Sequence, residues 1–99
     1  MKGKFESVIQ DTRPVIVDFH ALWCNPCKMQ SPILKEVAAE LGDKVRVIKI
    51  DVDQNSEIAG RYNVQSVPTL IIFKNGKQIW RQSGVATKSQ LKDVLSQNM

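Results

Sequence analysis

The chain has 99 residues, 42% of them hydrophobic and 24% charged, which is typical of one globular domain spanning residues 1–99. The first residues contain no apolar run typical of a secretory signal, and no later stretch approaches the roughly 18 apolar residues of a membrane span, so we expect a soluble cytoplasmic chain without a membrane partner. The net charge of +4 arises in the last quarter of the chain. This charge favours solubility or the steering of acidic protein partners. Nucleic-acid binding is less expected, because the sequence has neither a Lys/Arg run nor interleaved aromatic residues.

The first half of the chain predicts a parallel strand–helix–strand unit. A short helix is expected around residues 5–9. Residues 14–19 (PVIVDF) and 44–52 (KVRVIKIDV) are rich in β-branched residues, and the first run is almost continuously apolar, as in a strand covered on both faces. Between them, apolar residues recur at helical spacing from Pro26, and Gly42 is the predicted stop. Such a unit has a right-handed crossover.

The second half begins with a short predicted helix over residues 55–63, capped by Asn55 or Ser56. It continues with two strand-like runs joined by Asn75-Gly76, the strongest short-range signal of an antiparallel hairpin. The hairpin should join the two earlier strands in one sheet.

A closing helix is predicted over residues 89–97, where apolar side chains share one face. The elements together predict an α/β fold in which a four-stranded mixed sheet is flanked by helices on both faces. No feature of the sequence demands an oligomer, and we expect a monomer.

The chain's two cysteines, Cys24 and Cys27, lie where the first strand gives way to the helix. This spacing places the first sulfur at the helix start and the second one turn further along, on the same face. Unpaired backbone N–H groups and the positive end of the helix dipole favour a thiolate on Cys24, the form that attacks disulfides. Pro26 suits the first turn of this helix. The motif predicts a dithiol that opens and closes without unfolding.

Two other uses of the cysteine pair are disfavoured. A structural disulfide is uncommon in a reducing compartment. A zinc site needs four ligands, whereas Cys24, Cys27 and the single histidine, His20, supply at most three nitrogen and sulfur donors. We therefore expect no metal.

The residues around the cysteines resemble the thioredoxin family. WCNPCK differs by one residue from the family's usual WCGPCK, and the similarity, from about Pro14 to the end, extends through VDF, MQSPIL, VIKIDVDQN, VPTLIIFKNG and the glycine of QSGV. The resemblance implies the thioredoxin fold and a reductase of protein disulfides in which Cys24 attacks and Cys27 resolves the mixed disulfide. It also implies disulfide-containing substrate proteins, a thioredoxin reductase (an NADPH-dependent flavoprotein) as electron donor, and no bound cofactor besides the redox-active Cys24–Cys27 disulfide.

Two charged residues are implicated in catalysis by the same resemblance. Asp18 is similar to the family's buried carboxylate that takes the proton from Cys27, and burial should raise its pKa toward the range of a general base. Lys49 resembles the lysine that balances this carboxylate. The alternative is that Asp18 and Lys49 form only a structural pair.

A docking surface is also implied. Pro68 resembles the family's cis-proline that faces the dithiol, and the backbone of Val67 would pair with an extended substrate segment as an added strand. The apolar collar around Cys24 would consist of Trp23, Pro26, Val67, Gly84 and Val85. Taken singly, Trp23 and Gly84 also have ordinary explanations as a half-buried side chain and a turn.

The chain departs from the family pattern at three places. Asn25 replaces the usual glycine between the cysteines and should tune the redox potential, in a direction that the sequence leaves open. His20, where the family often has an aromatic residue, either covers the site as a flat side chain or tunes the thiolate. The family's extra N-terminal strand is expected to be absent. Pro32 is expected to kink the helix and to have no chemical role.

Two further functions remain as alternatives. A disulfide oxidase or isomerase of the same fold uses the same cysteines at a higher potential, although the expected lack of an export signal disfavours it. A protein-binding module with the fold of an oxidoreductase would not need the dithiol.

Overall fold

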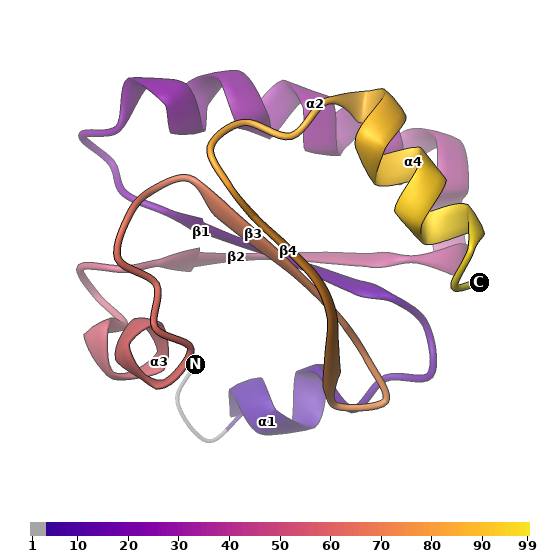
Figure 1. Ribbon diagram of the computed structural model, residues 1–99, viewed down its shortest axis with the longest axis horizontal. Coiled ribbons are helices and arrows are strands. Elements are labelled where there is room, and N and C mark those ends of the chain that lie inside the picture. The colour runs from indigo at the N-terminus through magenta and orange to yellow at the C-terminus, as the bar shows by residue number, and fades with distance from the viewer. Residues whose placement is uncertain (1–3) are drawn as a thin grey trace.

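The computed structural model describes residues 4–99, which form one sheet covered by helices. In chain order the elements are α1 (Phe5–Val8), β1 (Val15–His20), α2 (Asn25–Leu41), the 3₁₀ turn η2 (Gly42–Lys44), β2 (Arg46–Asp51), α3 (Ser56–Arg61), β3 (Thr69–Lys74), β4 (Lys77–Ser83) and α4 (Lys88–Ser96). Figure 1 shows α2 and α4 on one face of the sheet and α1 and α3 on the other. The α/β fold with helices on both faces is therefore confirmed.

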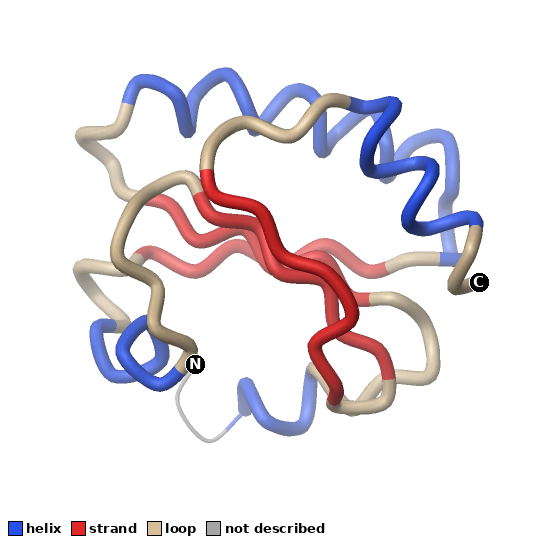
Figure 2. The backbone as a smooth tube through the Cα atoms, in the orientation of Figure 1, coloured by secondary structure: helices blue, strands red, loops and turns tan. Residues whose placement is uncertain are grey.

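The sheet has four strands in the order β2-β1-β3-β4. β1 and β2 are parallel, whereas β1 pairs with β3, and β3 with β4, in the antiparallel sense. The two parallel strands are joined by α2, as the sequence pattern predicted (Figure 2). The carboxyl ends of β1 and β2 consequently lie side by side, and α2 starts from this end of the sheet.

Two hydrophobic layers enclose β1, whose residues Val15–Phe19 are all buried. Val15, Val17 and Phe19 point to the face covered by α1 and α3, and Ile16 points to the opposite face with Leu34 of α2. This two-sided burial explains the continuous apolar run in the sequence. Asp18 lies on the same face as Ile16, beneath α2, because side chains alternate along a strand.

The turns confirm most of the predicted boundaries. Asn75 and Gly76 have φ values of 54° and 80°, as a two-residue hairpin turn requires. Gly42 caps α2 with a φ of 53°, and the helix continues past Pro32 to reach it. Asn55 precedes α3 but makes no side-chain cap; its amide donates to the Asp51 carbonyl oxygen instead, at 3.1 Å.

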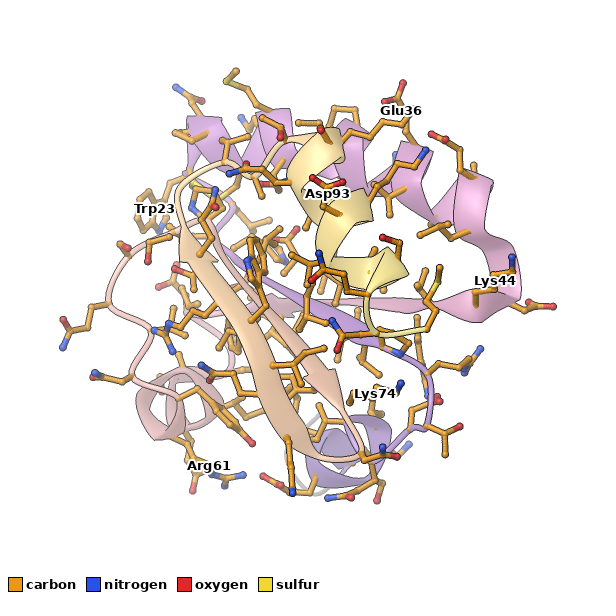
Figure 3. The ribbon with its side chains drawn as sticks, turned by 45° about the vertical axis from the view of Figure 1, so that its right-hand side comes forward. Trp23, Glu36, Lys44, Arg61, Lys74 and Asp93 are labelled. Carbon is orange, nitrogen blue, oxygen red and sulfur yellow. A yellow bond between two sulfur atoms is a disulfide. The ribbon has the colours of Figure 1, made fainter. Side chains whose placement is uncertain are left out.

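The basic residues of the last quarter are largely engaged in contacts within the fold. Lys88 and Lys92 both pair with Glu40 of α2, and Arg81 donates to backbone carbonyl oxygens of the segment after α3. In Figure 3 Lys74 lies well away from Trp23, and its ammonium donates to a carbonyl near the C-terminus. These contacts give the surplus charge a structural use; steering of acidic partners stays a prediction.

Two predictions concern the ends of the chain and membranes. Within residues 4–99 no helix is long and apolar enough to cross a bilayer. A strand before α1 would fall on residues 1–3, which lie outside the described part of the chain. Its absence therefore stays a prediction.

Candidate functional site

Cys24 and Cys27 form a disulfide at the start of α2, with Cα atoms 5.3 Å apart. Cys24 is the N-cap of the helix, and its sulfur accepts the backbone N–H of Cys27 at 3.2 Å. Asn25 and Pro26 open the helix and are exposed, so proline's missing N–H costs no helical bond. In a reduced chain this N–H and the helix dipole would stabilise a thiolate on Cys24.

Both sulfur-bearing side chains are shielded in this oxidised form. Cys24 is 3% exposed and Cys27 is 6% exposed, and they pack with Ala21 against the half-buried Val52 and Val67. Burial alone therefore does not distinguish the two cysteines. What distinguishes them is the N-cap position of Cys24.

Asp18 carries a buried carboxyl group. It is 1% exposed, and neither of its oxygens has a hydrogen bond among the described residues. Burial raises the pKa of Asp18 above its ordinary value of 3.8, and the charges of Lys49 and, less strongly, His20 partly offset this effect. A carboxyl group of this kind is suited to accept and release a proton closer to neutrality.

Lys49 is the register partner of Asp18 on the adjacent strand. Its ammonium group does not bond the carboxyl group, however, but donates to the Ser31 hydroxyl of α2 at 2.7 Å. Lys49 therefore balances Asp18 through space rather than through a salt bridge. Ser31, which holds the lysine, carried no signal in the sequence.

Trp23 forms part of the rim beside the dithiol and is 69% exposed. Its indole N–H donates to a carboxylate oxygen of Asp53 at 2.9 Å, which fixes the ring plane. Beyond the ring lies a shallow hollow of about 120 Å³ that reaches Val67 on the loop before β3. Figure 3 shows Trp23 at the end of the molecule away from Lys44, which follows α2. Asp53 was not predicted to belong to the site.

The loops before β3 and after β4 meet next to this hollow. The Val67–Pro68 peptide bond is cis, and the Pro68 carbonyl oxygen accepts the N–H of Gly84 at 2.8 Å. Gly84 is exposed, and Val67 and Val85 are half-buried. The fold thus brings both loops of the predicted collar together, although they are far apart in the sequence.

Gln30 fixes the second loop to the helix that carries the cysteines. Its side-chain amide donates to the Ala86 carbonyl oxygen at 3.1 Å and accepts the Ala86 N–H at 2.7 Å. Gln30 is completely buried, three residues after Cys27. A polar residue at this position on a predicted apolar helix face was the signal that could have identified it.

A side chain at Gly84 should affect folding and docking for separate reasons. Its φ of 87° favours glycine, so a substitution strains the backbone, and an added Cβ meets no neighbour but projects into the open space that an approaching substrate would occupy. We expect Gly84→Ala to lower the free energy of unfolding by about 1 kcal/mol and to raise KM for a protein disulfide several-fold.

Gly42→Ala is the matched control for this variant. Gly42 also has a positive φ and open space around its Cα, but it lies at the far end of α2. The Gly42→Ala variant should have a lower free energy of unfolding than wild type but the same KM for the protein disulfide. Equal KM values for Gly84→Ala and Gly42→Ala would remove Gly84 from the docking surface.

No metal-binding group emerges from the described chain. Among residues 4–99 no three His, Cys, Asp or Glu side chains are close enough to hold an ion. The arrangement combines a redox-active disulfide, a rim that includes the exposed Trp23, and the buried carboxyl group of Asp18. It can exchange disulfides with another molecule that reaches the sulfur of Cys24.

Comparison with known proteins gives the same family for the sequence and the fold. The family model described as Thioredoxin matches residues 1–97. A thioredoxin of Bacillus subtilis is 44% identical over 85 residues, which are 86% of this chain and 82% of that protein. Thioredoxin Y, a chloroplastic protein of Oryza sativa subsp. japonica, is 47% identical over 90 residues, 90% of this chain but 54% of that protein.

A solved structure has a closely similar backbone. It is described as a malarial protein and superposes with a TM-score of 0.82, covering 88% of this chain and 98% of that one, at 26% identity. The chain spans about half the length of the chloroplastic relative and most of the length of the bacterial one.

Proposed function

This chain belongs to the thioredoxin family and is a dithiol–disulfide oxidoreductase, and we propose that Cys24 is its attacking thiolate and Cys27 its resolving thiol. The observation that carries this assignment is the N-cap position of Cys24, whose sulfur accepts the N–H of Cys27. That geometry lowers the free energy of a negative charge on Cys24 and offers nothing similar to Cys27.

The reaction begins when the Cys24 thiolate attacks one sulfur of a substrate disulfide. The substrate's sulfur–sulfur bond breaks, one substrate sulfur leaves as a thiolate, and Cys24 becomes disulfide-bonded to the other. Cys27 then transfers its proton to Asp18 and attacks the Cys24 sulfur. The second substrate sulfur leaves as a thiolate, and the Cys24–Cys27 disulfide closes. Two electrons have passed to the substrate.

The buried carboxyl group and its lysine partner support the second step. A thiolate is a far better nucleophile than a thiol, so Cys27 needs a base at the moment of attack. Asp18 is buried beneath α2 and lacks a competing hydrogen bond among the described residues. Lys49 limits the rise in its pKa. The carboxylate is therefore available to accept the proton from Cys27.

The substrate's polypeptide would dock on the collar of Trp23, Pro26, Val67, Gly84 and Val85. The shallow hollow between Trp23 and Val67 offers apolar surface beside the disulfide. An extended segment that pairs with the backbone of Val67 would gain main-chain hydrogen bonds irrespective of its sequence. This mode suits an enzyme that reduces many different protein disulfides.

The remaining parts of the proposal concern partners and location. A thioredoxin reductase, the NADPH-dependent flavoprotein, would return the disulfide to the dithiol, and the protein itself would act as a monomer without a bound cofactor. We place the chain in the cytoplasm, where it would support electron transport to reducible proteins. One relative is named as chloroplastic, so proteins of this family also occur in an organelle.

The reduction potential of the Cys24–Cys27 pair tests this proposal against a disulfide oxidase or isomerase. Equilibration with a glutathione or thioredoxin reference buffer should give about −270 mV, the value of a thioredoxin. A value near about −180 mV or above would indicate disulfide exchange or oxidation instead. The Asn25→Gly variant, measured in parallel, isolates the effect of the exposed Asn25.

A further inference from the structure

A hollow of about 220 Å³ lies beside Cys27, and none of the collar residues lines it. Its walls come from the end of β1, the loop after it, the first turns of α2, and β2, namely His20, Ala21, Leu22, Cys27, Lys28, Ser31 and Lys49. The mechanism described above gives no task to His20. Its place in this wall puts it on the side of Cys27, the resolving cysteine.

Asp18 has to release its proton before the next turnover, yet it is cut off from solvent. Its side chain is 1% exposed and lacks hydrogen-bond partners among residues 4–99. His20 lies two residues further along β1, on the same face and about 7 Å away along the strand. His20 is half-buried and lines the hollow, so it is a neighbour of Asp18 on β1 that also reaches this opening to solvent.

We propose that His20 is a positioning residue for Asp18. His20 couples the protonation of the buried carboxyl group to solvent at the hollow, and it thereby sets the pH range in which Asp18 can deprotonate Cys27. The inference rests on the proposed function, in which Asp18 is the base for Cys27. It assigns a role to the one histidine of the chain.

The electrostatic effect of His20 differs from that of Lys49. Burial raises the pKa of Asp18, and the charges of Lys49 and His20 both lower it. A lysine side chain carries its charge throughout the neutral range, whereas a histidine gains its charge only as the pH falls between about 8 and 5. A lysine beside Asp18 therefore attracts the carboxylate throughout the neutral range, whereas the attraction of a histidine depends on pH in that range.

The other charged groups near this pair are held by contacts of their own. On β2, Lys49 donates to Ser31, and Asp51, the register partner of His20, accepts two backbone N–H groups through one carboxylate oxygen. From α2, Lys28 and Cys27 line the hollow. β3 opposes Asp18 with an apolar residue, Leu70. Besides the Cys27 thiol of the reduced protein, His20 is the side chain in this wall of a type that can change its charge near neutral pH.

The experiment compares His20→Phe with Lys28→Gln in the full chain. Lys28 lines the same hollow but is not among the charges that lower the pKa of Asp18, so its removal controls for a general loss of positive charge. The Asp18 titration is followed in the reduced protein by the carboxyl carbon resonance. The resolution rate is followed as the second release of thionitrobenzoate from Ellman's reagent, between pH 5 and 9.

We expect wild type to show a titration of Asp18 in two coupled steps and His20→Phe to show a single step, displaced upward by about one pH unit. At pH 6 the resolution rate of His20→Phe should fall by up to about tenfold, because less carboxylate is ionised, and at pH 9 it should equal that of wild type. Lys28→Gln should follow the wild-type titration.

Two results would overturn this inference. One is an Asp18 titration and a rate profile that are identical in His20→Phe and wild type. The other is a shift in the titration of Cys24 with none in Asp18, which would assign His20 to the attacking thiolate. Failure of the proposed function is a separate result, since reduced wild type would then leave a protein disulfide unreduced while the carboxyl titration stayed readable. His20→Gln repeats the test with a second neutral side chain.

Discussion

A Cys27→Ser variant should accumulate stable covalent complexes with disulfide-containing proteins, whereas Cys24→Ser should form none. The attacking thiolate is intact in Cys27→Ser, so the first exchange proceeds, but no second thiol remains to release the substrate. Cys24→Ser lacks the sulfur at the helix N-cap and cannot begin. Turnover should fall by about a thousandfold or more in each variant, because each loses one of the two reacting groups.

The measurement is non-reducing electrophoresis of each variant after incubation with a protein disulfide, followed by mass spectrometry of the adduct. If the stability of these variants is compared with wild type, the wild type must be in its reduced form, because neither variant can close the Cys24–Cys27 disulfide. Complexes formed by Cys24→Ser through Cys27 would reverse the assigned roles. A partner function that survives replacement of both cysteines would identify a binding module instead.

The sequence predicts those parts of the fold and site that depend on local patterns. The apolar run of β1 reflects burial on both faces, and the Asn75-Gly76 turn reflects a backbone with two positive φ values. The placement of Cys24 and Cys27 at a helix start follows from the strand before them and from Pro26 within the first turn. Each of these signals lies within a few residues of the feature that it predicts.

The features that escaped prediction depend mostly on contacts between distant segments. Gln30 bonds Ala86 across 56 residues, and Lys49 finds Ser31 of α2 instead of the carboxyl group of Asp18. Such pairings depend on how α2 is docked on the sheet, which no local pattern specifies.

The capping box of α4 was also missed, although its signal is entirely local. Thr87 and Gln90 form a capping box at the start of α4, with both reciprocal hydrogen bonds present. The Thr-x-x-Gln spacing just before an apolar helical pattern is the usual signature of this motif. It places the helix start at Lys88, one residue before the predicted range.

Removing the carboxyl group of Asp18 should stabilise the protein at neutral pH and slow its catalysis. Burial places the pKa of Asp18 in the folded state above the ordinary 3.8, so the folded state binds this proton more tightly than the unfolded chain. The stability contributed by Asp18 is complete below pH 3.8 and is lost as the pH rises through the higher pKa. Above that pKa, Asp18→Ala should raise the free energy of unfolding by about 1–3 kcal/mol.

Thermal or urea unfolding of the oxidised protein between pH 4 and 9 tests whether Asp18→Ala raises the free energy of unfolding. Wild type should lose stability across the window above pH 3.8, and the variant should lack that loss. Asp18→Asn, which keeps the size of the side chain but cannot ionise, should remove the same slope and separates charge from packing. Lower stability of both variants at neutral pH would show that an unseen contact satisfies the carboxylate.

The Asp18→Ala and Asp18→Asn variants should also lack the base that acts on Cys27. Resolution of the mixed disulfide should slow by about a hundredfold near pH 7, within the range that a positioned general base contributes. The deficit should shrink as the pH rises, because hydroxide then deprotonates Cys27 without help. Stopped-flow measurement of the second thiol release, from pH 6 to 10, separates this effect from the attack by Cys24. A resolution rate that stays unchanged across this range would leave Asp18 and Lys49 as a structural pair. The buried charge of Asp18, which lowers the stability of the fold, would then have no catalytic role to explain it.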